Sequence, residues 1–231
     1  MFRPFAEAEL AAVKAMKRDH VAVAPRADII REDEVGGPIY TLFEGWAIRY
    51  HRLPSGGRQI LDILLPGDTI GLASAMLGTV RHSVQAITAA TLCVIDGRGL
   101  PALFERHPGM GLNLLQTRVE EEQRQDVRLS LLGRSRAEQR IGYLMLETFD
   151  RLRQRGMVDG GSTCPFPLQR RDLADAAGLS RVHVARILDT LRARRLAEIQ
   201  DGVLVLFDRP RLAGLVGYVP VRVAAGRRAI L

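Results

Sequence analysis

The chain has 231 residues, of which 47% are hydrophobic and 26% are charged, ordinary values for a globular protein with a substantial core. It contains no run of about 18 or more apolar residues, so no membrane-spanning helix is expected, and its first ten residues do not resemble a secretory signal. Two cysteines, Cys93 and Cys164, are too few for a disulfide framework or a structural zinc site. A reducing, cytoplasmic location is therefore expected.

The formal net charge of +7 is unevenly distributed along the chain. Residues 1–132 carry 15 basic and 16 acidic side chains, whereas residues 133–231 carry 18 basic side chains, all of them Arg, and 10 acidic ones. A basic excess confined to the C-terminal part indicates an anionic partner for that part. The alternative is a solvated basic surface without a partner.

The N-terminal part is predicted to be rich in β-strands. After an expected helix over Glu7–Lys17, short apolar runs alternate with turns that contain Gly and Pro. These runs are Ile39–Phe43, Ala47–Tyr50, Ile60–Leu65, Ser83–Ile87 and Thr91–Ile95. Short strands at regular spacing are typical of a sandwich or barrel.

From Gly99 onward the apolar spacing becomes helical. A short helix is expected around Leu100–Phe104, and a long one from Pro108 to about Leu132. Apolar residues on the long helix recur at steps of three and four, which predicts a dimerisation seam formed by Leu112, Leu115, Val119 and Leu129. Packing of this face on its own domain is the alternative. Gly133–Ser135 is the expected hinge before another amphipathic helix that ends near Gly156.

The segment from Gln169 to Asp208 has the pattern of a winged helix-turn-helix. Arg171–Ala177 has helical spacing, Gly178 supplies a tight turn, and Ser180 is a good N-cap for a second helix. Two strand-like runs, Ala197–Gln200 and Val203–Phe207, then flank an Asp-Gly pair, which is a strong hairpin signal. Such a motif places its second helix in the DNA major groove.

With these motifs the chain, apart from its tail, resembles the Crp/Fnr family of transcription regulators. Leu64–Gly71, with the sequence LLPGDTIG, resembles the turn before the family's effector pocket, and Leu179–Arg186 resembles its recognition helix. The resemblance implies an α+β chain with an N-terminal β-roll (a double-stranded jelly roll). The implied domains are the β-roll sensor at 1–107, a dimerisation helix at 108–133, a winged helix-turn-helix at 134–219 and a flexible basic tail at 220–231.

The resemblance also places an effector pocket in the β-roll, but the key residues differ from those of members that bind cyclic AMP. Those members have a Gly-Glu pair and an Arg-Ser pair, where this chain has Gly71-Leu72 and His82-Ser83. Arg81 lies one residue earlier and would point the other way on a strand. These five residues are the candidate effector site, with plain surface polarity as the alternative for Arg81 and His82. Dependence on cyclic AMP is not expected, although a regulator gated by a cyclic nucleotide remains an alternative.

No cofactor is predicted, and an unidentified effector remains open. The chain lacks the N-terminal cysteine cluster of iron–sulfur members, so no Fe–S cluster is expected. A haem-gated regulator is an alternative, because four histidines are available, but they lack metal-ligand spacing: His20, His51, His82 and His107. Cys164, before Pro165, is a candidate redox thiol if oxidants reach it, and the favoured alternative is an inert side chain. Cys93 lies in an apolar run and is expected in the core.

The resemblance transfers more completely to the DNA-binding residues. Gln169 and Arg170 match phosphate-contacting positions, and Ser180 matches a phosphate-contacting cap. Arg186 matches the Arg that contacts guanine or phosphate, and Arg181 matches an Arg of some members. The family's Glu, which reads cytosine, is Val182 here, so the half-site is expected to differ from that of the cyclic AMP receptor protein. His183 is a further candidate contact.

The predicted function is a homodimeric, sequence-specific regulator that binds a palindrome in double-stranded DNA and has RNA polymerase as a partner, with no membrane association. A DNA-architectural protein without an effector is the alternative from a different class. A cupin-like enzyme is a third alternative, but no His-x-His with a following Glu, nucleophile elbow, P-loop or HExxH motif is present. No enzymatic activity is therefore predicted.

Overall fold

The computed structural model describes residues 6–158 and 161–221, which form two compact units. The first unit contains residues 6–52 and 62–122, and the second contains Leu53–Leu61 together with the described residues from Gln123 onward. The basic tail predicted at 220–231 lies almost entirely outside the described residues. Within the described ranges, no helix is both long and apolar enough to cross a membrane.

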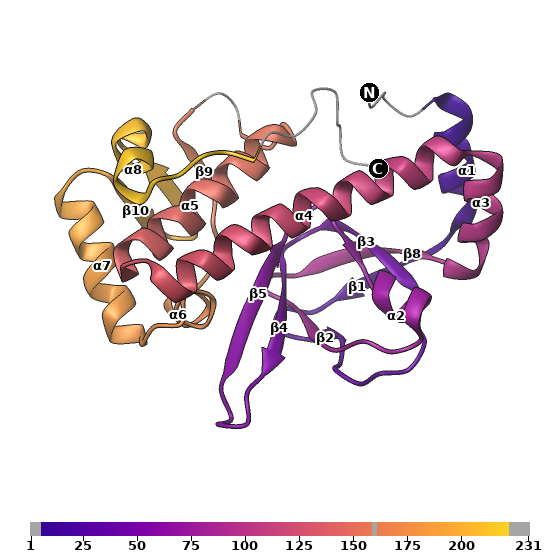
Figure 1. Ribbon diagram of the computed structural model, residues 1–231, viewed down its shortest axis with the longest axis horizontal. Coiled ribbons are helices and arrows are strands. Elements are labelled where there is room, and N and C mark those ends of the chain that lie inside the picture. Colours follow the sequence, from indigo (N-terminus) through magenta and orange to yellow (C-terminus); the bar gives the residue numbers. More distant parts are fainter. Residues whose placement is uncertain (1–5, 159–160, 222–231) are drawn as a thin grey trace. The chain divides into compact units, whose positions relative to one another are not determined.

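The N-terminal part is rich in strands, as predicted from its apolar runs (Figure 1). Its two four-stranded sheets have the strand orders β1-β8-β3-β6 and β2-β7-β4-β5. The strands are β1 (Lys17–Val23), β2 (Asp28–Ile30), β3 (Ile39–Glu44), β4 (Ala47–Arg52), β5 (Arg58–Leu64), β6 (Thr69–Ile70), β7 (Ser83–Ala86) and β8 (Ala90–Ile95). Strand β1 escaped prediction because most of its side chains are exposed and its sequence, KRDHVAV, begins with four polar residues.

The inner side chains of these strands form an apolar core. Leu42 on β3 lies directly opposite Leu92 on β8, and Ala47 on β4 lies opposite Ala86 on β7. All four are buried and belong to one cluster, with Leu64 of β5 among its other members. Burial of such side chains, at about 25 cal/mol per Å² of apolar surface, supplies the main stabilisation of the fold.

The helices of the first unit are α1 (Glu7–Met16), α2 (Leu72–Leu77) and α3 (Leu100–Arg106), followed by the long α4 (Pro108–Arg134). The long helix is confirmed, but the hinge predicted at Gly133–Ser135 is too early, because α4 continues through Gly133 and Arg134. One glycine costs a helix only about 1 kcal/mol relative to alanine. The break falls instead at Ser135 and Arg136, between α4 and α5 (Ala137–Gln154).

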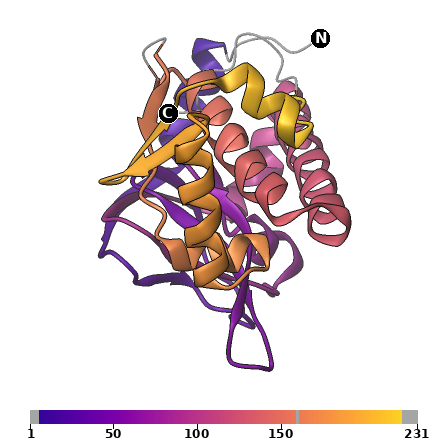
Figure 2. The same cartoon turned by 90° about the vertical axis from the view of Figure 1, so that its left-hand side faces the viewer.

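The C-terminal part contains the predicted winged helix-turn-helix (Figure 2). The helices α6 (Arg170–Ala177) and α7 (Arg181–Ala193) are joined by Gly178, whose φ of 63° is the left-handed conformation that the tight turn requires. Strands β10 (Ala197–Gln200) and β11 (Val203–Leu206) pair in antiparallel register around the Asp-Gly turn. A third strand, β9 (Thr163–Pro165), pairs with β11 on its other side.

One further helix, α8 (Arg209–Val216), was not predicted. Its signals are short but recognisable, because the Asp208 carboxylate accepts a hydrogen bond from the Arg211 N–H at 3.0 Å and Pro210 lies in the first turn. This helix packs against α5 at a place where α5 carries Gly142. A Cβ atom at position 142 would lie 2.7 Å from Cγ1 of Val216, so the absence of a side chain permits the close approach.

Candidate nucleic-acid interface

The N-terminal turns of α7 form an exposed polar surface above a buried apolar face. Val184, Ile187 and Leu191 are buried, because their spacing places them on the side that packs against α6 and α5. The residues predicted to read DNA lie on the other faces and are all exposed: Arg181, Val182, His183 and Arg186. A helix held by one face in this way can enter a groove with the other.

Ser180 fixes where α7 begins. Its hydroxyl accepts a hydrogen bond from the backbone N–H of His183 at 3.2 Å, as predicted for an N-cap. The cap leaves the other N–H groups of the first turn available to an anion, which the positive end of the helix dipole also favours. The start of α7 is therefore suited to a phosphate as well as to base edges.

The two arginines on the reading face of α7 are unpaired within the described parts of the chain, and this sets them apart from the arginine at its far end. Arg181 and Arg186 form no ion pair there. Arg192, in contrast, lies 3.9 Å from Asp189 and 3.6 Å from Glu198. The uncompensated positive charge is thus concentrated near the N-terminus of α7.

The N-terminus of α6 also carries exposed polar residues. Gln169 is the N-cap, Arg170 is the first helical residue, and both are exposed. The backbone N–H of Gln169 donates to Oδ2 of Asp172 at 2.9 Å, which closes the first turn of the helix. All seven residues predicted to contact DNA therefore lie at the N-terminal ends of the two helices or in their first two turns.

The predicted seam of α4 is exposed in the single chain. The exposed fractions are 61% for Leu112, 60% for Leu115, 43% for Val119 and 71% for Leu129. Val127, which sequence reasoning did not include, is also exposed, at 36%. Large apolar side chains in a row on a helix surface favour burial against a second helix.

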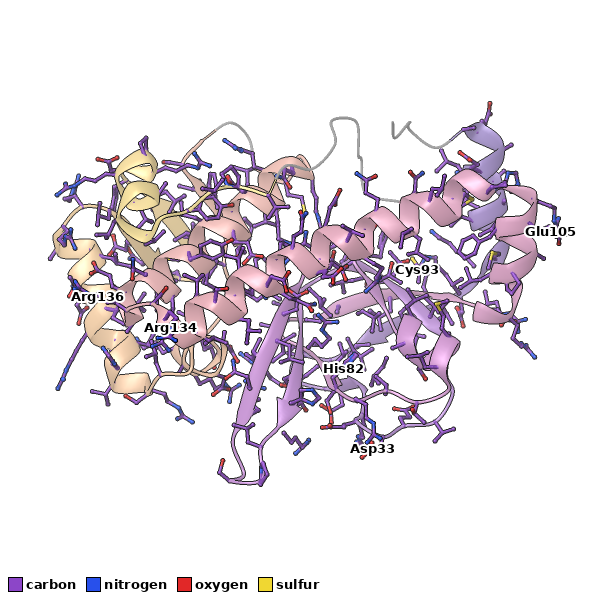
Figure 3. All side chains as sticks on the ribbon, viewed as in Figure 1. Asp33, His82, Cys93, Glu105, Arg134 and Arg136 are labelled. Atoms are coloured by element: carbon purple, nitrogen blue, oxygen red, sulfur yellow. The ribbon has the colours of Figure 1, made fainter. Side chains whose placement is uncertain are left out.

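The candidate effector residues occupy several environments in the β-roll; Figure 3 labels one of them, His82. Gly71 is the N-cap of α2 and Leu72 is its first residue. The side chain of Arg81 is 85% exposed and lies 3.5 Å from the Asp33 carboxylate. The Ser83 hydroxyl is buried and accepts a hydrogen bond from the backbone N–H of Glu32 at 3.0 Å, so it is already engaged.

Beside His82 lies a group of polar side chains that sequence reasoning missed, here called the β-roll cluster: Glu32, Arg49, His51, Asp62 and His82. Nη2 of Arg49 lies 3.7 Å from the buried Asp62 carboxylate, and Nδ1 of His51 lies 3.2 Å from Oε1 of Glu32. Arg49 is directly opposite the core residue Val84 on β7, so its side chain starts from the inner face of the sheet. The only local feature of the sequence that indicates this cluster is the alternation of Arg49 and His51 with apolar Ile48 and Tyr50.

Electrostatics keep one member of the cluster neutral. Burial, followed by the positive charges of Arg49 and His51, lowers the pKa of His82 to about 4, and Glu32 opposes this effect. At neutral pH the imidazole therefore carries no charge that could compensate a cyclic phosphate. Within the described ranges, no group of three or more His, Cys, Asp or Glu side chains could hold a metal ion.

Both cysteines are buried. Cys93 lies in the core, as predicted. Cys164 lacks the exposure that a redox thiol needs, which agrees with the favoured alternative of an inert side chain. Burial raises the pKa of Cys164 to about 12, which keeps the thiol protonated and unreactive at neutral pH. The cause is the pairing of β9 with β11, a contact between residues about 40 apart.

A β-rich domain, a long helix and a winged helix-turn-helix together define a two-domain DNA-binding transcription regulator. Residues 20–107 match the cyclic nucleotide-binding domain, and residues 139–215 match the Crp-like helix-turn-helix domain. The chain belongs to the Crp/Fnr family and is a sequence-specific DNA-binding transcription regulator.

Similar proteins include two regulators and one solved structure. The transcriptional activatory protein AadR of Rhodopseudomonas palustris is 33% identical over 189 residues, which cover 81% of this chain and 77% of AadR. The nitrogen fixation regulation protein FixK of Bradyrhizobium diazoefficiens is 28% identical over 187 residues, with the same coverage. The structure of FixK2 from Bradyrhizobium japonicum matches with a TM-score of 0.74 and 25% identity, covering 87% of this chain and 98% of FixK2.

Proposed function

We propose that the protein is a homodimeric activator of the cytoplasm that binds a palindromic promoter site and contacts RNA polymerase there. The observation that carries the dimer is the row of exposed apolar side chains on α4, with Leu112, Leu115 and Leu129 each at least 60% exposed. Activation is supported by the name of AadR, a transcriptional activatory protein. Two copies of α7 would then enter successive major grooves on one face of the DNA.

Within each half-site, the exposed residues divide into two roles. Arg186 reads a base edge, for which a guanine with two acceptors is the best partner of a guanidinium. Val182, which is 63% exposed, contacts a thymine methyl group, and Arg181 and His183 extend the same surface. Gln169, Arg170 and Ser180 hold phosphates and thereby set the register of the protein on the duplex.

The proposal includes a β-roll that does not respond to cyclic AMP. Leu72 cannot accept hydrogen bonds from ribose hydroxyls, and Arg81 is an exposed residue near Asp33. Ser83 is engaged with Glu32, and His82 is neutral at pH 7. The groups that would hold the ribose and neutralise the phosphate are thus absent or occupied.

The proposal is tested by selecting DNA from a random pool with the purified protein. We expect a palindrome whose half-site centres lie about one helical turn, roughly 10 bp, apart. The Val182→Glu variant restores a carboxylate that accepts from cytosine N4, so it should select a different base at one position of each half-site. Selection of DNA without any palindrome would contradict the proposal and favour an architectural protein.

A further inference from the structure

The segment that precedes and begins β5, Leu53–Leu61, belongs to the second compact unit and contacts α6. Arg58 provides the main contact, because its guanidinium bridges two carboxylates of that helix. Nη2 lies 2.7 Å from Oδ1 of Asp172, and Nε lies 2.6 Å from Oδ2 of Asp175. The neighbouring Gln59 side chain donates to the carbonyl oxygen of Ala176 at 3.2 Å, near the end of the same helix.

Burial makes these ion pairs stronger than ordinary surface pairs. The exposed fractions of the side chains are 19% for Arg58, 0% for Asp172 and 29% for Asp175. Charge-assisted hydrogen bonds of normal length in such a setting are about twice as strong as neutral ones. A buried carboxylate that loses its partner, by contrast, is costly.

Asp172 connects Arg58 to the DNA-facing end of α6. One oxygen of its carboxylate pairs with Arg58, while the other accepts the hydrogen bond from the backbone N–H of Gln169 that closes the first turn. That turn carries Gln169 and Arg170, the proposed phosphate contacts. Arg58 therefore acts on the group that fixes the geometry of this turn, and it also offsets the negative charges of Asp172 and Asp175, which would repel phosphates.

The opposite end of the segment is also held. The carbonyl oxygen of Leu61 accepts a hydrogen bond from Nη1 of Arg128 on α4 at 3.0 Å. Nε of the same guanidinium donates to Oε2 of Glu147 on α5 at 2.8 Å, and Glu147 is buried. With Gln59 and Leu61 also held, Arg58 has little freedom to leave α6.

We propose that Arg58 is a positioning residue for DNA binding. It holds the first turn of α6 and neutralises Asp172 and Asp175, so that Gln169 and Arg170 meet the phosphate backbone without repulsion. This inference rests on the proposed phosphate contacts of α6.

The test measures DNA affinity by fluorescence anisotropy on a palindromic duplex selected by the wild-type full-length chain. Arg58→Ala should weaken DNA binding about tenfold, because the positive charge that neutralises Asp172 and Asp175 is lost. Asp175→Asn removes one of the two carboxylates that Arg58 no longer neutralises, so Arg58→Ala/Asp175→Asn should recover most of the affinity. Arg98→Ala is the matched control, because Arg98 also pairs with an aspartate, Asp96, but is 83% exposed, and it should bind as the wild type does.

Unchanged or tighter binding by Arg58→Ala would overturn the inference. A loss of affinity that Asp175→Asn does not restore, together with a lowered melting temperature, would show a merely structural role and would overturn it as well. If Arg58→Ala does not fold, Arg58→Lys and Arg58→Lys/Asp175→Asn are compared by the same criteria, because lysine keeps the charge but lacks the planar fork. If the wild-type protein selects no palindrome, the proposed function fails first and independently.

Discussion

The charged side chains on the reading face of α7 and those of the β-roll cluster differ in whether they form ion pairs. On α7, Arg181 and Arg186 are exposed and free of ion pairs among the described residues, so they are available to a partner. In the β-roll, Arg49 is paired with Asp62 and His51 with Glu32. The first region is prepared for an external anion, whereas the second satisfies its charges internally.

This difference shows why family membership transfers function unevenly. A recognition helix acts through side chains that project from one short segment, so the same local geometry with matching residues keeps its chemistry. An effector pocket depends on groups from several strands, and a few replacements redirect their pairing. In the proposed function, the shared β-roll is therefore a fold-level similarity, while the helix-turn-helix binds the DNA.

The largest expected effect comes from breaking the feature that couples two DNA-reading helices. Leu115→Glu with Val119→Glu places two charges in the exposed seam of α4, so the protein should sediment as a monomer. DNA affinity should fall by a factor on the order of 100 or more, because the second half-site no longer binds intramolecularly. Val35→Glu with Met76→Glu, which also changes two exposed apolar residues, is the control. A dimeric seam variant would mean that the seam is misassigned.

The next effect concerns base reading. Arg186→Ala should lose about 1–3 kcal/mol of binding free energy to the selected site and relax the preference at one base position, because a bidentate guanine contact disappears. Competition against a panel of single-base variants of the duplex measures both quantities. An unchanged preference at every position would show that Arg186 does not read a base.

Replacing Arg170 should affect DNA binding differently from replacing Arg186, because Arg170 is assigned to a phosphate and Arg186 to a base. Arg170→Ala should weaken all sequences to a similar degree and reduce the slope of log affinity against log salt by about one, because one phosphate contact is lost. Arg192→Ala on α7, where the arginine is already paired with acidic residues, is the control and should leave the slope nearly unchanged. A sequence-dependent loss in Arg170→Ala would contradict its assignment to phosphate.

A smaller effect distinguishes the β-roll by its response to pH. The pKa of His82 is about 4 in the folded state and about 6.5 when unfolded, so the unfolded state takes up the proton first. The contribution of neutral His82 to the free energy of unfolding is present above pH 6.5 and is lost as the pH falls toward 4. The melting temperature should therefore drop from pH 7 to pH 5, and His82→Gln should reduce that drop. His20→Gln, at an exposed position, should leave that drop unchanged. Equal pH profiles of the melting temperature for wild type and His82→Gln would show that His82 does not cause the drop.

The smallest expected effect is the response to cyclic AMP. Calorimetry with micromolar cyclic AMP should give no binding heat, and DNA affinity should not change, because Leu72 and neutral His82 replace the groups that hold ribose and phosphate. Tight binding of cyclic AMP together with a stronger affinity for DNA would show that the β-roll, like the DNA-reading region, binds an external anion.

The sequence predicted those parts of the fold that depend on local spacing. Gly178, Ser180 and the Asp-Gly hairpin lie within about 25 residues, and each acts through its own backbone geometry, so the winged helix was predictable. The β-roll cluster was not, because its members come from separate strands and loops, and local spacing does not show that Arg49 meets Asp62 or that His51 meets Glu32. The burial that makes Cys164 inert depends on the pairing of β9 with β11, so the sequence left a redox role open. Helix α8 was missed because only Asp208 and Pro210 mark its start.

Gly142 illustrates how a residue without a side chain can determine which helices fit together. A glycine costs the interior of α5 about 1 kcal/mol of helix stability relative to alanine. An alanine would nevertheless bring its Cβ to 2.7 Å from Val216 and 3.1 Å from Leu212, so α8 would have to move outward. The usual stabilising exchange of a helical glycine for alanine is therefore expected to reverse its sign at this position. A search for stabilising substitutions guided by helix propensity alone would choose Gly142 early, and the resulting variant would have a less tightly packed α8.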